Sequence, residues 1–418
     1  MMKLRLGSLK QEFASQTGFL LIATTIGYAF GYLYLVLMGR ALGPEVFGIL
    51  GSLVGIFYIA GLIGQALREA TASSLAAIKA KAGEAAAVGT FLKLGTKLGL
   101  LCPLPALVFI PASQQIASFF HLDSVTPVLV LGFSFSACLI LEVISGFLQG
   151  LQQFRMLGII TYLVPQGSKL LFGIALVWAG WGLPGAIAAL LASTAIAIMT
   201  GLVLIRRQLA GGVHRQAQHN PRLGPILIPT LILAIFMAMP TSVDVMLVTH
   251  FFGATDAGLY NSAATLGKVV IFLPMAVSFV LLPKVTENHT LGLGSRRILL
   301  QSLLYAFVLS GGVVLLYWLI PDTIIKLFFG PDYVEAGNLV GWYGMAMLLF
   351  SLNFVLIHYS LAIRSIGLML LADFITLAEV VAIALVHQSL PQVIWILLLG
   401  NLLIFLFSFP YLTIFKRY

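Results

Sequence analysis

The sequence predicts an all-α, polytopic membrane protein with about twelve transmembrane helices, in two parallel repeats of six helices with both termini in the cytoplasm. Three observations lead to this prediction. The 418 residues are 60% hydrophobic and only 9% charged, whereas a soluble domain has about 25% charged residues. Apolar runs of about 20 residues, enough to cross a hydrocarbon core of about 30 Å as a helix, recur along the chain. Short motifs also recur about half a chain apart.

The apolar runs are continuous rather than alternating, which favours helices over the strands of a closed barrel. The basic opening MMKLRLGSLKQEF precedes a run longer than a signal-peptide core, so we expect a retained first helix. The predicted spans are 17–38, 46–66, 87–110, 125–147, 157–178 and 183–205 in the first half, then 225–252, 261–283, 298–320, 337–361, 366–387 and 392–414.

Basic residues orient the spans. Of the 23 lysines and arginines, four lie within predicted spans and two, Arg40 and Lys326, face away from the termini, so the remaining 17 lie on the side of the termini. The positive-inside rule assigns that side to the cytoplasm, and Arg296 and Arg297 belong to it. The charges are spread over short loops, so the net charge of +9 reflects topology and does not indicate a nucleic-acid partner.

Two pairs of motifs indicate an internal repeat. GRALGPEVFG at 39–48 resembles HFFGATDAGLY at 250–260, and IASFFHLDSV at 116–125 resembles IIKLFFGPDYV at 324–334. Because six is an even number of spans, both copies would enter the membrane in the same sense. The predicted domains are a six-helix bundle over 1–210, a cytoplasmic linker over 211–223 and a second six-helix bundle over 224–418.

Glycines mark the corner after the first helix of each repeat. Gly43 and Gly48 stand five residues apart, and Gly253 and Gly258 repeat this spacing 210 residues later. Glycine lets a chain turn where a side chain would obstruct it. We therefore predict that these four glycines are structural turns and not part of a catalytic loop.

Three segments carry a resemblance to a known family: LGPEVFGIL at 42–50, VDVMLVTHFFGATDAGLYNSAATL at 243–266 and LFFGPDYVEAG at 327–337. Together with GFLQGLQQFR at 146–155, they resemble the polysaccharide exporters and Wzx-type lipid-linked oligosaccharide flippases. That family belongs to the multidrug/oligosaccharidyl-lipid/polysaccharide (MOP) exporter superfamily, with the MATE multidrug extruders and the lipid II flippases. The resemblance covers essentially the whole chain.

The resemblance implies a MATE-like bundle in the bacterial cytoplasmic (inner) membrane. It implies alternating access that moves an undecaprenyl-pyrophosphate oligosaccharide to the outer leaflet, for O-antigen or exopolysaccharide synthesis. The implied partners are the lipid-linked glycan, the phospholipid bilayer and polysaccharide polymerase machinery.

Ionisable groups within membrane spans usually face a water-filled cavity or a partner, which makes them candidates for function. Four lysines and Arg68, at the inner end of the second span, form a predicted cationic cavity for a pyrophosphate. Lys93 and Lys97 share a helix face because they stand four residues apart, although Lys93 could instead snorkel to the interface. The other two lysines are deeper: Lys169 and Lys268.

Four carboxylates are candidates for ion coupling or gating: Glu142, Asp244, Asp373 and Glu379. A bound proton or sodium ion could bias one conformation if it binds the two states unequally. Pro240 is expected to kink the seventh helix beside Asp244, because an internal proline removes a backbone hydrogen bond. Two alternatives stay open: Asp244 as a plain cap near the outer surface, and Glu142 as an interfacial group.

Other chemistry has no signature in the sequence. There is no G-x-x-x-x-G-K-[ST] loop and no H-E-x-x-H pair, so we expect no ATP hydrolysis, no metal, no cofactor and no enzyme activity. Two other functions remain as alternatives. A MATE-like multidrug or cation antiporter would present acidic, aromatic walls, whereas four lysines here balance four acids. The second alternative function is that of a membrane-embedded enzyme or assembly factor of glycan synthesis.

Overall fold

The computed structural model describes residues 2–210, 223–290, 294–363 and 365–415. Within these ranges all regular secondary structure is helical. In the described part of the chain, eight helices are long and apolar enough to cross a membrane, or nine if the bent pair Gly224–Ala238 and Thr241–Phe251 is one span. Two of the eight, Gly18–Ala82 with 65 residues and Phe154–Arg206 with 53, each contain two predicted spans. The all-α polytopic fold with about twelve spans is confirmed.

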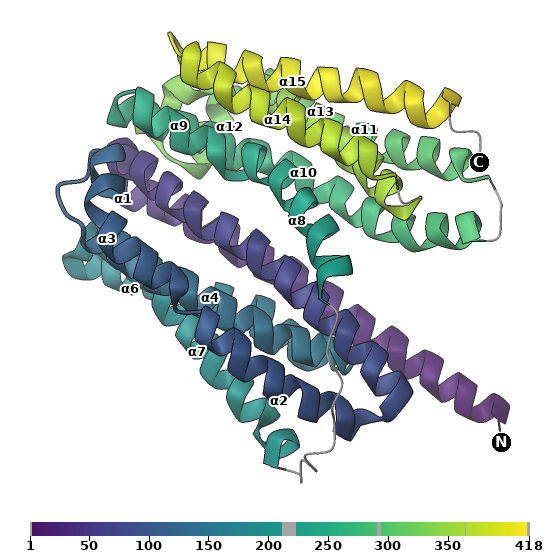
Figure 1. Cartoon of the computed structure of the whole chain (residues 1–418). Coiled ribbons are helices and arrows are strands. Elements are labelled where there is room, and N and C mark those ends of the chain that lie inside the picture. Colours follow the sequence, from purple (N-terminus) through teal and green to yellow (C-terminus); the bar gives the residue numbers. More distant parts are fainter. Residues whose placement is uncertain (1, 211–222, 291–293, 364, 416–418) are drawn as a thin grey trace. The chain divides into compact units, whose positions relative to one another are not determined.

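Fifteen α-helices follow one another in the described residues (Figure 1). In the first half they are α1 (Met2–Ala82), α2 (Glu84–Leu101), α3 (Leu104–Phe119), α4 (Thr126–Gly150), α5 (Phe154–Gly158), α6 (Val164–Leu176) and α7 (Gly182–Ala210). In the second half they are α8 (Gly224–Ala238), α9 (Asp244–Phe251), α10 (Ala254–Thr290), α11 (Arg296–Leu319), α12 (Pro321–Phe328), α13 (Gly337–Ala362), α14 (Ile366–Leu385) and α15 (Leu390–Pro410).

The chain forms two compact units. Unit 1 comprises Met1–Met38 and Ile56–Leu231, and unit 2 comprises Gly39–Gly55 and Ile232–Tyr418. The predicted bundles differ from these units at two places, since residues 39–55 belong to unit 2 and residues 224–231 to unit 1. The predicted linker falls almost wholly on residues 211–222, outside the described part of the chain. Compactness does not test a duplication, so the repeat stays a prediction.

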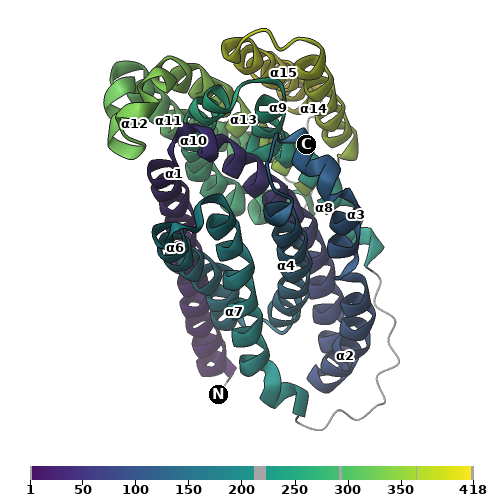
Figure 2. The ribbon, with the colours of Figure 1, turned by 90° about the vertical axis from the view of Figure 1, so that its left-hand side faces the viewer.

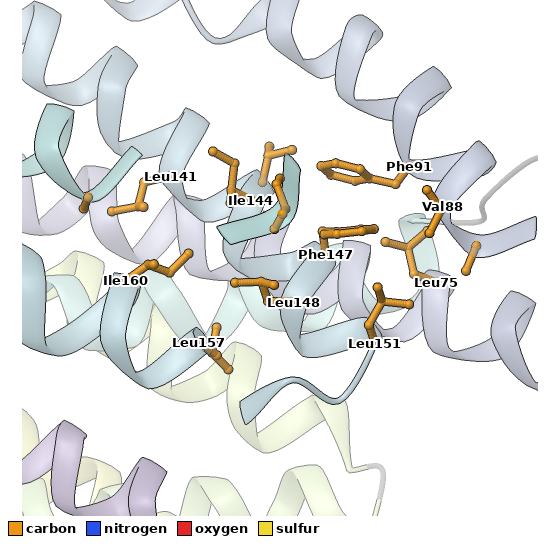
Figure 3. Close-up of a cluster of buried hydrophobic side chains, with 14 of the residues drawn as sticks. Leu75, Val88, Phe91, Leu141, Ile144, Phe147, Leu148, Leu151, Leu157 and Ile160 are labelled. Carbon is orange, nitrogen blue, oxygen red and sulfur yellow. The ribbon is translucent and has the colours of Figure 1, made fainter. Parts of the chain in front are cut away.

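The core of unit 1 lies around α4, which packs against α3 and α7, while α6 packs against α7 (Figure 2). The rings of Phe91 on α2 and Phe147 on α4 stack with their centroids 4.2 Å apart (Figure 3). Glycines allow α4 to approach α1 closely, because a Cβ at Gly146 would lie 2.8 Å from the carbonyl oxygen of Arg68. Such van der Waals packing of small residues is what holds helices together in lipid.

Unit 2 is built around α13, which packs against α10, α11 and α15. Its centre contains polar contacts as well as apolar ones: the hydroxyls of Ser310 on α11 and Ser351 on α13 lie 3.1 Å apart. Asn353 on α13 donates from Nδ2 to the carbonyl oxygen of Asn401 on α15 over 2.8 Å. These hydrogen bonds fix α13 between its neighbours, where water cannot replace them.

The corner in α1 is the part of the first half that belongs to unit 2. Gly43 adopts φ 74° inside α1, a left-handed conformation that only glycine adopts readily. The side-chain nitrogens of Arg40 donate to the carbonyl oxygens of Leu327 and Phe328 at the end of α12. The hydroxyl of Tyr333 donates to the carbonyl oxygen of Gly39 over 2.7 Å. These bonds fasten the corner to unit 2.

Gly48 and Gly258 have a different role from the predicted turn. Both lie within helices, α1 and α10, and a Cβ on Gly48 would be 2.7 Å from the backbone nitrogen of Gly258. A Cβ on Gly258 would overlap the carbonyl group of Pro44. The two glycines therefore let two backbones touch. Gly253 does lie at a break between helices, between α9 and α10, without a positive φ.

Candidate functional site

Arg68 and Glu142 form a buried ion pair in unit 1. The guanidinium nitrogen Nη1 of Arg68 lies 3.4 Å from Oε2 of Glu142 on α4, and Nε of Arg68 has no hydrogen-bond partner in the described residues. The prediction placed Arg68 at the inner end of the second span, but α1 continues to Ala82 and Arg68 is 8% exposed. The helix continues because residues 67–82 contain good helix formers and no glycine or proline.

Lys169 is a buried lysine of unit 1. It lies on α6 with 3% of its surface exposed, and its Nζ stands 5.0 Å from the centroid of the Tyr34 ring on α1. Such a cation–π contact partly compensates a desolvated ammonium. Tyr34 is held in place because its hydroxyl donates to the carbonyl oxygen of Ala186 on α7 over 2.8 Å. No carboxylate in the described residues forms an ion pair with Lys169.

Lys93 and Lys97 share one face of α2, as their spacing predicts, and both are exposed on the surface of unit 1. Lys169, in contrast, is buried on α6. Their predicted role in a cationic cavity stays a prediction.

Asp244 is the centre of a polar cluster in unit 2. It is fully buried at the start of α9, and its Oδ2 accepts hydrogen bonds from the hydroxyls of Tyr343 over 2.7 Å and Tyr260 over 3.1 Å. Gly267 on α10 makes room for this arrangement, since a Cβ there would overlap the Tyr343 ring. We call Asp244, Tyr260, Tyr343, Lys268 and Glu379 the acid–tyrosine cluster. Full burial and two tyrosine donors do not fit a plain capping role near the surface.

The other charged members of this cluster lie on α10 and α14, and α14 contributes a further buried acid. Lys268, half-buried on α10, and Glu379, 5% exposed on α14, both interact electrostatically with Asp244. Glu379 also packs on Gly400 of α15, where a Cβ would overlap Oε1 of the carboxyl group. Asp373 lies six residues before Glu379 and is 6% exposed. One oxygen of each acid has no hydrogen-bond partner in the described residues: Oδ1 of Asp244, Oδ1 of Asp373 and Oε1 of Glu379.

A bend precedes Asp244. A π-helical turn, Met239–Val243, joins α8 to α9. The helices on either side of it make an angle of 50° with each other. The proline at 240 removes a backbone donor, which accounts for a break in the regular hydrogen-bond ladder. The side chain of Pro240 lies outside the described residues.

Four polar partners in unit 2 were not predicted from the sequence. Tyr260 and Tyr343 were not separable from other apolar aromatics, because their role depends on residues 16 and 99 positions away. Asn353 and Asn401 could have been identified from the sequence, since each is an isolated amide in an apolar run, in FSLNFVL and LLGNLLI. An amide in hydrocarbon requires a partner.

The arrangement suits binding rather than covalent chemistry. Among the described side chains, unit 1 buries two cations, Arg68 paired with Glu142 and Lys169 beside the Tyr34 ring. Unit 2 buries acids that each have one oxygen without a hydrogen-bond partner in the described residues. The described residues contain no group of three or more His, Cys, Asp or Glu side chains that could hold a metal ion. Acids of this kind can bind a proton or a monovalent cation.

Solved structures with the same fold define the class. The inward-facing conformation of a multidrug resistance MATE family transporter of the MOP superfamily aligns with 91% of this chain and 93% of its own, with TM-score 0.75 and 17% identity. The lipid II flippase MurJ in an inward closed conformation aligns with 93% of this chain and 87% of its own, with TM-score 0.70 and 14% identity. The chain is thus a multi-pass membrane protein with the MOP-superfamily fold.

The family follows from the sequence itself. The profile of the polysaccharide biosynthesis protein family matches residues 13–289, about two thirds of the chain, and the protein belongs to this family. A sequence search of curated proteins found no match. The resemblance to polysaccharide exporters is confirmed at the level of the family.

Proposed function

We propose that this protein flips an undecaprenyl-pyrophosphate oligosaccharide from the cytoplasmic to the outer leaflet of the bacterial cytoplasmic membrane, for synthesis of a surface polysaccharide. Membership of the polysaccharide biosynthesis family is the observation that carries the proposal. The fold, shared with a protein whose structure is described as a lipid II flippase, supports a carrier of a lipid-linked glycan. No covalent step and no cofactor is required.

Cations in unit 1 support binding of the pyrophosphate group of the substrate. A pyrophosphate needs positive partners in a low-dielectric environment, where an unpaired lysine or arginine interacts far more strongly than in water. Lys169 lacks a carboxylate partner among the described residues, and Nε of Arg68 is free. The lipid tail would remain in the bilayer while the glycan occupies water, with Lys93, Lys97 and Lys268 as further cations.

The acid–tyrosine cluster supports coupling of transport to a sodium or proton gradient. A sodium ion or proton bound at Asp244, with Glu379 nearby, would neutralise a buried charge and favour the conformation that buries it. Asp373 offers a third carboxylate oxygen without a hydrogen-bond partner in the described residues, while Glu142 is already paired with Arg68. Delivery of the glycan to polymerase machinery would follow on the outer side.

A second candidate function is export of cationic drugs, favoured by the likeness to the MATE family transporter. One assay separates the two. Purified protein in proteoliposomes would be given either a fluorescent undecaprenyl-pyrophosphate oligosaccharide or a cationic dye. Movement of the glycolipid, and not of the dye, is the expected result. Transport of the dye alone would replace the flippase proposal by the drug exporter.

A further inference from the structure

A shallow, open surface depression of about 470 Å³, which we call the groove, lies on the first turns of α11 in unit 2. Among the described residues its lining is Arg296, Arg297, Leu300, Gln301 and Leu304. The five residues follow one another on adjacent turns of a single helix, at spacings of three and four, so they form one continuous face. None of them belongs to the two clusters of charged residues described above.

The groove faces away from the core of unit 2. Leu299, Leu303 and Ala306 enter the hydrophobic core that α11 shares with α10 and α13. Leu300 and Leu304 lie on the opposite face, 40% and 59% exposed. Because α11 is one of the membrane-spanning helices, apolar side chains that leave the protein core meet lipid chains. The apolar part of the groove is therefore a surface for hydrocarbon.

The charged part of the groove lies at the membrane surface. Arg296 and Arg297 begin α11, at the same end of unit 2 as the C-terminal end of α15 (Figure 1), which is the end predicted to be cytoplasmic. Both arginines are exposed, and no carboxylate whose side chain is described forms an ion pair with either. Two exposed guanidinium groups without an ion pair to any described carboxylate suit a phosphate, which arginine binds through two parallel hydrogen bonds.

The spacing of the two parts indicates an amphipathic ligand. Eight residues separate Arg296 from Leu304, a rise of about 12 Å along a helix. A free phosphate would use only the arginines, whereas a phospholipid would place its phosphate on them and its acyl chain along the leucines. The cytoplasmic leaflet is also where anionic lipids attract juxtamembrane basic residues.

We propose that this groove binds an anionic phospholipid of the cytoplasmic leaflet, with the phosphate at Arg296 and Arg297 and an acyl chain along Leu300 and Leu304. Its occupant is a membrane lipid that stays in place, and not the glycan carrier proposed above as the substrate. The inference does not depend on which substrate the protein moves.

The test uses the full-length protein in nanodiscs with phosphatidylglycerol that carries a photoreactive diazirine in its acyl chain. Crosslinks to the peptide around residues 300–304 are counted by mass spectrometry. The variant Arg296→Gln/Arg297→Gln removes the phosphate contacts, and Arg296→Lys/Arg297→Lys keeps their charge. A matched control is Lys81→Gln/Arg206→Gln, which removes two exposed positive charges of unit 1. In a further experiment, unlabelled lipids and inorganic phosphate compete with the photoreactive probe for the groove.

Each arginine near an anionic surface contributes about 1 kcal/mol, roughly fivefold in affinity. We expect crosslinking to fall at least tenfold in the glutamine variant, to stay near the wild-type level in the control, and to be largely retained in the lysine variant. Three results would overturn the proposal. These are equal labelling of the glutamine variant, equal labelling by a phosphatidylcholine probe, and displacement by inorganic phosphate as readily as by phosphatidylglycerol. Preferential displacement by an undecaprenyl-pyrophosphate lipid would identify a substrate site instead.

Discussion

Lys169 combines features that separate a functional cation from a structural one. It is almost fully buried, and its contact with Tyr34 is weaker than an ion pair. A buried charge without a counter-charge destabilises a fold, and apolar replacements of buried charges are often neutral or stabilising. A lysine retained in such a place is therefore expected to act in binding.

Replacing Lys169 by methionine tests this role. We expect Lys169→Met to reduce glycolipid translocation at least tenfold while the melting temperature stays equal or rises, since the apolar chain keeps the volume and removes the desolvation penalty. Lys81→Met, at an exposed position, serves as the control and should transport normally. A lower melting temperature with unchanged transport per folded molecule would assign Lys169 a structural role.

Asp244 allows a second test at the same scale. Asparagine can still accept both tyrosine hydrogen bonds at the retained oxygen but carries no negative charge. We expect Asp244→Asn to fold normally and to lose the stimulation of transport by an imposed sodium or proton gradient. Transport is measured in proteoliposomes with each gradient separately. Gradient stimulation equal to that of the unchanged protein would exclude Asp244 from ion coupling.

At the scale of elements, only features that a short stretch of sequence encodes could be predicted. Apolar runs of about 20 residues are visible without knowledge of the fold, so the spans and the corner at Gly43 were predictable. Contacts between helices were not, because they depend on which faces meet. The charge at Arg68 ended an apolar run, but the helix formers after it carry α1 on to Ala82. Its pairing with Glu142 on α4 has no local signal.

The helix contact at Gly258 can be tested directly. A methyl group there would overlap the carbonyl group of Pro44, and overpacking of this kind costs about 1 to 3 kcal/mol. We expect Gly258→Ala to lower the melting temperature in detergent. Gly312→Ala is the matched control, because nothing lies within 4 Å of a Cβ at that position of α11, where alanine is the better helix former. Equal melting temperatures for the two variants would contradict the close contact of the backbones.

At the scale of the whole molecule, the two compact units do not coincide with the two halves of the sequence. A fragment of residues 1–216 would contain unit 1 up to the linker but would leave residues 39–55 without their partners in α9, α10 and α12. In the full chain Arg40 is held by carbonyl oxygens of α12. Proteases need locally unfolded chain, so an unanchored corner is a preferred cleavage site.

The rate of cleavage by trypsin measures how well the corner is anchored. We expect cleavage after Arg40 to be at least ten times faster in the fragment 1–216 than in the full chain, both purified in detergent. Cleavage after Lys81, exposed in unit 1, should be similar in the two proteins and serves as the internal standard. Equal rates of cleavage at Arg40 would show that its contacts with α12 do not protect the corner.

The anchoring of this corner also has a consequence for biosynthesis. The carbonyl oxygen of Phe47 accepts a hydrogen bond from Asn261, 214 residues later in the chain. At a translation rate of about 5 to 20 residues per second, the corner would wait on the order of 10 to 40 s for its partner. During that interval the corner lacks the partners in unit 2 that hold it in the finished protein. The carbonyl group of Phe47 gains its hydrogen-bond donor only after the eighth predicted span has emerged from the ribosome.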